Sequence, residues 1–229
     1  MTLVLLPGMD GTGQLFASFI AALGTGYNVK VVVFPPAEPL GYKELEQIAR
    51  AALPIDGPYI ILGESFSGPI AVSLAASGSP NLKGLILCCS FLSNPRPIFS
   101  AFHSLIMILP RVPVSLLARV LFGRFITREL QVALTQALSL VSLSVIRARL
   151  QAVLAINVSS QLSVVKVPVL YLRASRDQVV PASASALIAK LNPRTRIIEL
   201  VAPHCLLQAF PIKAAQEVNT FVRELQSGF

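Results

Sequence analysis

The residue best suited to nucleophilic chemistry in this chain is Ser65, because of what surrounds it. It follows a run of β-prone apolar residues, Tyr59–Leu62, and small residues stand two positions to either side, Gly63 and Ser67. A helix-like apolar run begins at Ile70. Strand, tight turn and helix in this order form the pattern of a nucleophile elbow, which lifts the serine clear of the strand end. A glycine- and serine-rich loop without chemistry has the same pattern, so the interpretation depends on partners elsewhere.

A serine nucleophile needs a base that accepts its proton, and the base needs an acid that orients it. The chain offers two imidazoles, His103 and His204. His204 follows the expected strand Arg196–Val201, whereas His103 lies in a region with no expected strand. We therefore predict His204 as the base and interpret His103 as a structural residue.

Three aspartates compete for the role of the orienting acid: Asp10, Asp56 and Asp177. Asp56 lies in a turn at the opposite edge of the expected sheet. Asp177 follows the expected strand Val169–Arg173 and precedes Val180 and a proline. We predict that Asp177 orients His204; its alternative interpretation is a turn or helix N-cap residue.

A glycine-rich loop follows the first expected strand and reads Pro7-Gly8-Met9-Asp10-Gly11-Thr12-Gly13. It is predicted to present the Met9 N–H as one oxyanion donor, with the Phe66 N–H as the second. Gly8 and Asp10 are candidate substrate contacts. A dinucleotide site is rejected because the order is G-x-x-G-x-G rather than G-x-G-x-x-G, and the second expected strand ends in Pro35-Pro36 rather than an acid.

The elements that position these loops alternate between strands and helices. The strand-like runs are mostly continuous apolar stretches, as in parallel strands covered on both faces. This alternation predicts a doubly wound α/β fold, whose ligands bind at the carboxyl ends of the strands. The expected strands are Leu3–Leu6, Val29–Phe34, Tyr59–Leu62, Leu85–Cys89, Val169–Arg173 and Arg196–Val201, and the expected helices are Gln14–Leu23, Tyr42–Leu53, Phe66–Ser77, Ala182–Leu191 and Ala214–Leu225.

One region, about residues 97–160, shows only helical apolar spacing. We expect it to be a helical lid inserted into a core made of residues 1–96 and 161–229. Phe102 and Met107 are its candidate substrate contacts. The lid's apolar residues are predicted to house an acyl chain or, equally well, to form the lid's own core; they are Ile98, Phe99, Phe102, Leu105, Ile106, Met107, Leu109, Leu116 and Leu117.

The composition narrows the classes of function. The chain has 229 residues, of which 54% are hydrophobic and 13% are charged, so we expect one large core with some exposed apolar surface. The formal charge is +8, and the lid region holds six arginines against one acid, Glu129. These arginines stand among leucines rather than in a basic run with aromatics, which argues against nucleic acid and favours an anionic lipid surface.

The chain carries no pattern for a metal, a cofactor or a disulfide framework. Cys88 and Cys89 are adjacent and Cys205 is isolated, so we expect reduced thiols and a cytoplasmic setting. No segment reads as a signal peptide. The uncharged run Leu130–Ile146 is interrupted by polar residues and is short for a membrane span, so we predict a partly buried helix.

Over nearly its whole length the chain resembles the α/β-hydrolases. The matching positions are Gly8-Met9, the elbow Gly63-Glu64-Ser65-Phe66-Ser67-Gly68, Asp177 with Val180-Pro181, His204, and the closing helix with Phe210-Pro211 before it and Phe221 in it. The resemblance implies a mostly parallel sheet of about six strands, without the first two of the family's usual eight. It also implies a Ser65 nucleophile, a His204 base, an Asp177 orienter and Met9 and Phe66 oxyanion amides. The glycine loop is also similar to one in phytyl-ester-synthase-type acyltransferases.

Three functions are therefore carried forward. The first is a serine hydrolase that cleaves carboxylic esters with an apolar acyl group, in the manner of a carboxylesterase or lipase. The second is an acyltransferase that passes the acyl group to an alcohol or lipid acceptor. The third, a non-catalytic ligand receptor, is disfavoured by the intact serine, aspartate and histidine. No cofactor is predicted, and the sequence makes no prediction of the oligomeric state.

Overall fold

The computed structural model describes residues 1–97 and 112–227. Within them, six strands form one parallel sheet in the order β2-β1-β3-β4-β5-β6. The strands are β1 (Thr2–Leu6), β2 (Asn28–Val31), β3 (Tyr59–Glu64), β4 (Leu82–Cys88), β5 (Val169–Ala174) and β6 (Arg196–Leu200). The predicted parallel sheet of about six strands is confirmed.

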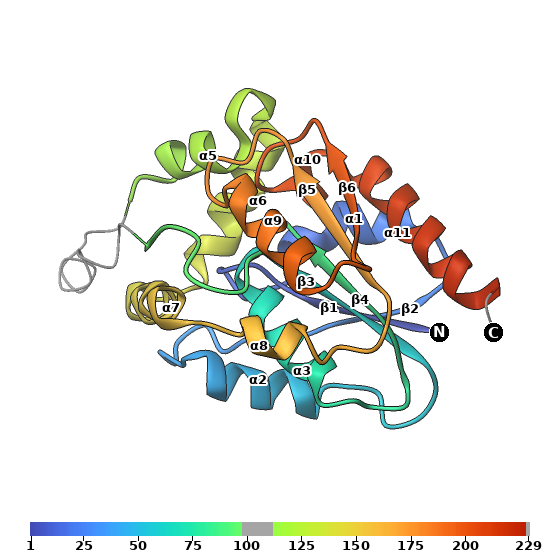
Figure 1. Cartoon of the computed structure of the whole chain (residues 1–229). Coiled ribbons are helices and arrows are strands. Elements are labelled where there is room, and N and C mark those ends of the chain that lie inside the picture. Colours follow the sequence, from blue (N-terminus) through green and yellow to red (C-terminus); the bar gives the residue numbers. More distant parts are fainter. Residues whose placement is uncertain (98–111, 228–229) are drawn as a thin grey trace.

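Helices cover both faces of this sheet (Figure 1). Alternate residues along the four inner strands pack into two separate cores. One core lies under α2 (Tyr42–Ala51), α3 (Gly68–Ala76), α8 (Ser159–Leu162) and α9 (Ala182–Leu191). The other lies under α1 (Ala17–Leu23), α10 (Leu206–Ala209) and α11 (Pro211–Ser227). Short 3-10 turns precede two of these helices: η1 (Gln14–Phe16) and η2 (Ser65–Ser67).

The central and edge strands differ in burial. β3 is buried along its whole length, whereas the edge strand β2 exposes alternate residues and β6 exposes three of its five. The prediction of continuous apolar strands is thus right for the centre and wrong for the edges. The second strand was expected to reach Phe34, but it ends at Val31, and Phe34 instead donates its N–H to the Gly11 carbonyl at 2.8 Å. Pro35-Pro36, which lacks backbone donors, follows directly.

The register of the strands brings the predicted site loops together. Leu6 of β1 lies opposite Gly63 of β3, so the glycine loop and the Ser65 turn leave the sheet side by side. Ala174 of β5 lies opposite Leu200 of β6, so the loops that carry Asp177 and His204 also leave together. All four loops emerge at the carboxyl edge of one sheet.

The described part of the expected lid region contains helices only, except for an isolated antiparallel bridge between Ser93 and Asn157. Its elements are α5 (Val114–Phe122), η4 (Gly123–Phe125), α6 (Arg128–Ser139) and α7 (Leu143–Ala155). The Val158 N–H donates to the Leu92 carbonyl at 2.8 Å, so this segment returns to the sheet close to where it leaves. Phe102, Met107 and His103 lie outside the described residues.

The single helix expected over Leu130–Ile146 is wrong, because the chain breaks between α6 and α7. Ser142 starts α7: its side chain caps the Val145 N–H, and its own N–H donates to the Pro36 carbonyl at 2.9 Å. Among the described residues no single helix is both long and apolar enough to cross a membrane. The pair α6 and α7 passes that test jointly, by length and composition only, with a bend of 98° between them.

A third apolar cluster anchors α5 and α6 over the carboxyl edge of the sheet. Ala118 and Phe122 of α5 and Leu134 of α6 pack with Cys205, the residue after His204. The Cys205 N–H also donates to the Leu121 carbonyl at 3.2 Å. The α5–α6 hairpin therefore contacts the loop that carries the predicted base.

Candidate active site

Ser65, His204 and Asp177 form one hydrogen-bonded chain. Ser65 Oγ lies 2.8 Å from His204 Nε2, and His204 Nδ1 lies 2.8 Å from Asp177 Oδ2. The His204 and Asp177 side chains are 6% and 5% exposed, so little water competes for the pair. With the proton on Nδ1 donated to Asp177, Nε2 is free to accept the Ser65 proton.

The backbone holds Asp177 in this orientation. Its second oxygen, Oδ1, accepts the N–H groups of Val179 and Val180, both at 2.8 Å. Arg176 donates its N–H to the Ala202 carbonyl at 3.0 Å, which joins this loop to the one that precedes His204. Asp177 is therefore both a turn residue and the partner of His204, so the two interpretations of this aspartate are compatible.

The turn at Ser65 is strained in the way that an elbow requires. Ser65 has a φ of +46°, a conformation that non-glycine residues rarely adopt. A Cβ at Gly63 would lie 2.7 Å from Ala71 Cβ and 2.9 Å from the Ser67 carbonyl oxygen, so only glycine fits there. The Ser67 hydroxyl donates to the Pro7 carbonyl and thereby ties the elbow to the glycine loop.

Ser90, which lies just after β4, supports the elbow and was not predicted from the sequence. Its hydroxyl donates to the Ser65 carbonyl at 2.6 Å, and its own carbonyl accepts the Tyr171 hydroxyl at 2.7 Å. A Cβ at Gly68 would lie 1.7 Å from Ser90 Oγ, which explains the glycine that follows the elbow. The sequence shows only a serine directly after an apolar run. Without the pairing register of the strands, this does not indicate a contact with Ser65.

Phe66, one of the two predicted oxyanion residues, directly follows Ser65, and Met9, the other, lies in the glycine loop. Phe66 begins the run toward α3, in which Pro69 occupies the first turn as expected. The Tyr42 hydroxyl donates to the Phe66 carbonyl at 2.9 Å, and the two rings stack with centroids 4.7 Å apart. Met9 follows Gly8 in a turn that the Gly11 N–H closes onto the Gly8 carbonyl at 3.0 Å.

Two of the four candidate substrate contacts are described, and both belong to the glycine loop. Gly8 is buried, and Asp10 is 7% exposed. The Asp10 carboxylate accepts the backbone N–H and the hydroxyl of Thr12, at 2.9 and 2.5 Å. In this structure Asp10 thus stabilises its own turn. The Phe102 and Met107 predictions remain outside the described residues.

Glu64, directly before the nucleophile, is a buried acid to which the sequence reading gave no role. Its Oε1 accepts the side-chain amide of Gln208 at 2.9 Å, and its carboxylate also accepts the Gly8 N–H. Burial raises the pKa of Glu64 to about 7, an effect that the Asp10 charge reinforces and the Gln208, His204 and Gly8 contacts oppose. The group therefore changes its charge near neutral pH.

Cys205 lies beside His204 but does not compete as a nucleophile. Burial raises the pKa of its thiol well above the usual range, so it stays protonated at neutral pH. Cys88, Cys89 and Cys205 are all free and buried. Among the described residues, no group of three or more histidine, cysteine and acidic side chains could hold a metal ion.

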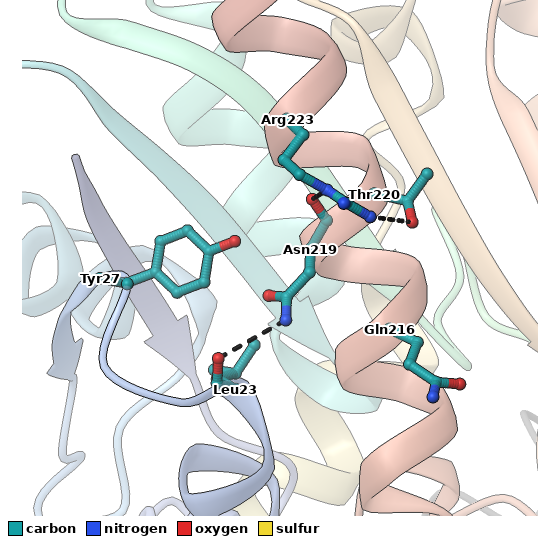
Figure 2. A pocket seen from close by; sticks show the side chains of 7 residues that line it. Leu23, Tyr27, Gln216, Asn219, Thr220 and Arg223 are labelled. Carbon is teal, nitrogen blue, oxygen red and sulfur yellow. Dashed lines mark hydrogen bonds between the residues drawn. The ribbon is translucent and has the colours of Figure 1, made fainter.

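A pocket of about 460 Å³ lies at the opposite, amino edge of the sheet, between the end of α1 and helix α11 (Figure 2). Tyr27, Asn219 and Arg223 project toward it. Arg223 bonds back to its own helix, through the Asn219 carbonyl and the Thr220 hydroxyl. This pocket is thus separate from the hydrogen-bonded serine, histidine and aspartate.

Known proteins resemble this chain in fold and in part of the sequence. Phytyl ester synthase 1, chloroplastic, of Arabidopsis thaliana is 35% identical over 124 residues, which are 50% of this chain and 17% of that protein. An esterase from Rhodococcus is 22% identical with a TM-score of 0.78 over 98% of this chain and 91% of that one. An esterase from Exiguobacterium antarcticum is 16% identical with a TM-score of 0.82 over 97% and 92%.

The two solved structures share the fold with this chain, including the parallel sheet and its flanking helices. A family model described as serine aminopeptidase S33, a group of hydrolases, matches residues 42–204. The match runs from the start of α2 to His204 and includes Ser65 and Asp177. It therefore covers most of the chain, and the protein belongs to the serine aminopeptidase S33 family of α/β-hydrolases.

Proposed function

We propose that this protein is a serine hydrolase that cleaves carboxylic esters with an apolar acyl group, through an acyl-enzyme on Ser65. The observation that carries the proposal is the buried chain of hydrogen bonds from Ser65 through His204 to Asp177. A family name alone does not choose a substrate, because peptidases, esterases and transferases use the same parts on this fold.

The first half of the reaction forms the acyl-enzyme. Ser65 Oγ attacks the ester carbonyl while His204 Nε2 accepts its proton, and Asp177 stabilises the imidazolium that forms. The resulting oxyanion is stabilised by the N–H groups of Met9 and Phe66, each worth roughly 3 kcal/mol in such sites. His204 then returns the proton to the leaving alcohol, and the carbon–oxygen bond of the ester breaks.

The second half releases the acid. A water molecule gives a proton to His204 and attacks the acyl carbonyl, and the imidazolium then protonates Ser65 Oγ as the acid leaves. An apolar acyl group is proposed because the lid region is rich in leucine, isoleucine and phenylalanine. In the described part of the lid region, the apolar cluster around Phe122 and Leu134 packs beside Cys205, the residue that follows the base His204.

An acyltransferase is the second candidate, and a specific similarity favours it. The Arabidopsis relative, 35% identical over half of this chain, is named a phytyl ester synthase. An acyltransferase uses the same acyl-enzyme on Ser65 but admits an alcohol in place of water. The two candidates therefore differ only in which nucleophile attacks the acyl group in the second half-reaction.

We also propose that the enzyme meets its substrate at an anionic lipid surface through α5. Leu116 and Val120 stand four residues apart on α5 and are 54% and 36% exposed, so they form a short apolar stripe along the helix. Val112, which precedes the helix, is 40% exposed. Arg119 of α5 and Arg124 of the following η4 turn are exposed. An apolar stripe flanked by cations is the composition that binds anionic membrane interfaces.

A reducing, cytoplasmic setting is proposed from the three buried thiols.

Replacing Ser65 with alanine should lower kcat for p-nitrophenyl esters by at least about 10⁴-fold, because the nucleophile is lost while the fold is kept. Rates should be measured across acyl lengths, with an aminoacyl p-nitroanilide as the peptidase substrate. Ser183→Ala, an exposed serine on α9, is the matched control and should keep wild-type activity. Full esterase activity in Ser65→Ala would exclude the mechanism, and faster anilide than ester cleavage would make the protein a peptidase.

Acyl transfer should be tested by adding a long-chain alcohol to the ester assay and quantifying both products by mass spectrometry. A hydrolase yields free acid whether or not the alcohol is present. A transferase yields the new ester in excess over free acid, with the same dependence on Ser65. Free acid alone, at alcohol concentrations that saturate the site, would exclude the transferase candidate.

Binding to lipid should be visible by co-sedimentation with vesicles. We expect the protein to bind vesicles that contain phosphatidylglycerol more strongly than pure phosphatidylcholine, and Leu116→Ser with Val120→Ser to weaken that binding. Ile55→Ser is the control, since Ile55 is 89% exposed in a loop at the other edge of the sheet. The proposed surface would be contradicted if the α5 double variant bound these vesicles as strongly as Ile55→Ser, or if the wild type did not bind them.

Glu64 should make the stability of the protein fall as the pH rises. Its pKa is raised from 4.5 to about 7 in the folded state, so the unfolded chain releases this proton at lower pH than the folded one. The free energy of unfolding of the wild type should therefore decrease relative to Glu64→Gln between about pH 4.5 and 7, by on the order of 1–3 kcal/mol. Urea denaturation across this range measures the difference, with the exposed Glu38→Gln as control. A constant difference between wild type and Glu64→Gln would show that Glu64 does not titrate there.

A further inference from the structure

Arg149 is a charged residue with no exposed surface. It lies on α7 and is 0% exposed, the largest fully buried side chain in the described residues. Burial lowers the pKa of its guanidinium to about 10, against the attraction of Asp10, so the group stays charged at neutral pH. Burying a charge is costly unless its hydrogen bonds are made, so its partners indicate what it is for.

Those partners are carbonyl oxygens of the two loops that leave β1 and β2. Nη1 donates to the Met9 and Asp10 carbonyls, both at 2.8 Å, and Nη2 donates to the Pro35 carbonyl at 3.1 Å. The guanidinium also lies near the Phe34 ring, with Cζ 5.8 Å from its centroid. Charged donors make stronger hydrogen bonds than neutral ones, so this group fixes the peptide planes it touches.

The glycine loop is shaped around this guanidinium. Gly11 has a φ of +72°, and a Cβ there would lie 2.5 Å from Arg149 Nη1 and 2.9 Å from Arg149 Cζ. Glycine at this position therefore serves two purposes: it permits the turn and it leaves room for the cation. The loop and the arginine, 138 positions further along the chain, form one unit.

Met9 connects this unit to the chemistry. Its carbonyl is held by Arg149, and its N–H is one of the two oxyanion donors in the mechanism proposed above. The Met9 N–H shares its peptide plane with the Gly8 carbonyl, which the Gly11 N–H holds, and Arg149 holds the next plane through the Met9 carbonyl. Together the two bonds restrain the torsions of Met9 and hence the direction in which its N–H points. Since an oxyanion donor acts only when aimed at the developing charge, the restraint matters most in the transition state.

We propose that Arg149 is a positioning residue for the oxyanion hole, through which helix α7 of the lid region holds the Met9 amide in its working direction. This inference rests on the proposed function. Arg149 does not touch the substrate, since it has no exposed surface. Its effect on turnover passes through the backbone that it holds, above all the glycine loop, so a change in the position of α7 would reach the oxyanion hole through this side chain.

The test compares Arg149→Met, Arg149→Lys and the exposed control Arg128→Met, each purified and checked for folding by circular dichroism and thermal melting. Methionine keeps much of the volume but donates no hydrogen bond, while lysine keeps the charge as a single donor centre. We expect kcat for the best p-nitrophenyl ester to fall about 10–100-fold in Arg149→Met, with KM within about twofold, because a misdirected donor loses part of the 10²–10³-fold effect of a whole one. Arg149→Lys should fall between Arg149→Met and the wild type.

Chemical rescue separates positioning from general stability. Arg149→Ala leaves space for a free guanidinium ion, so millimolar guanidinium should raise its kcat, while the same concentration of ammonium should raise it less and neither should raise the rate of Arg128→Ala. If Arg149→Met does not fold, Arg149→Lys and the rescue of Arg149→Ala decide the question. Folded variants with wild-type kcat, or losses that appear in melting temperature and KM but not in kcat, would overturn the inference. An inactive wild type or an active Ser65→Ala would instead overturn the proposed function.

Discussion

The hydrogen bond between Ser65 Oγ and His204 Nε2, 2.8 Å long, joins residues 139 positions apart and depends on nearly every feature of the fold. Serine reaches the histidine only because β3 ends in a turn with a φ of +46°. Histidine is in place only because β5 and β6 pair in register, so that the Asp177 loop and the His204 loop leave the sheet together. A one-residue slip in either pairing would turn the side chains of that strand to the other face and separate the groups.

Around this bond, buried polar groups hold backbone rather than substrate. Ser90 bonds the Ser65 carbonyl, Glu64 accepts the Gly8 N–H, and Arg149 donates to the Met9 carbonyl. Each joins elements that are distant in sequence, and each is surrounded by low-dielectric protein, where a hydrogen bond is strong and an unmade one is costly. We infer that the rigidity of the site comes from this network, while the apolar cores on the two faces of the sheet supply its stability.

The sequence was enough to predict the parallel sheet, the elbow and the residues that meet at the carboxyl edge, because these depend on local patterns: apolar runs, a small-residue turn, and polar residues after strands. The supporting residues were not predictable in the same way. Arg149 reads as one of six arginines in a leucine-rich region, and only the fold shows that it is buried against Gly11. The break at Ser142 was also missed, because the uncharged run around it has helical spacing throughout. Its capping bond to the Val145 N–H is local, but the bond from the Ser142 N–H to the Pro36 carbonyl joins distant parts of the chain and is visible only in the fold.

The measurement that tests the central claim most directly is covalent labelling of the full chain with a p-nitrophenyl alkylphosphonate, followed by peptide mapping. A serine activated by a histidine attacks the phosphorus and displaces nitrophenolate, so one phosphonyl group should be found on Ser65. The same reagent should label His204→Ala far more slowly and Ser65→Ala not at all. An adduct on another residue, or labelling of Ser65 at the same rate without His204, would contradict the account of Ser65 as the activated nucleophile.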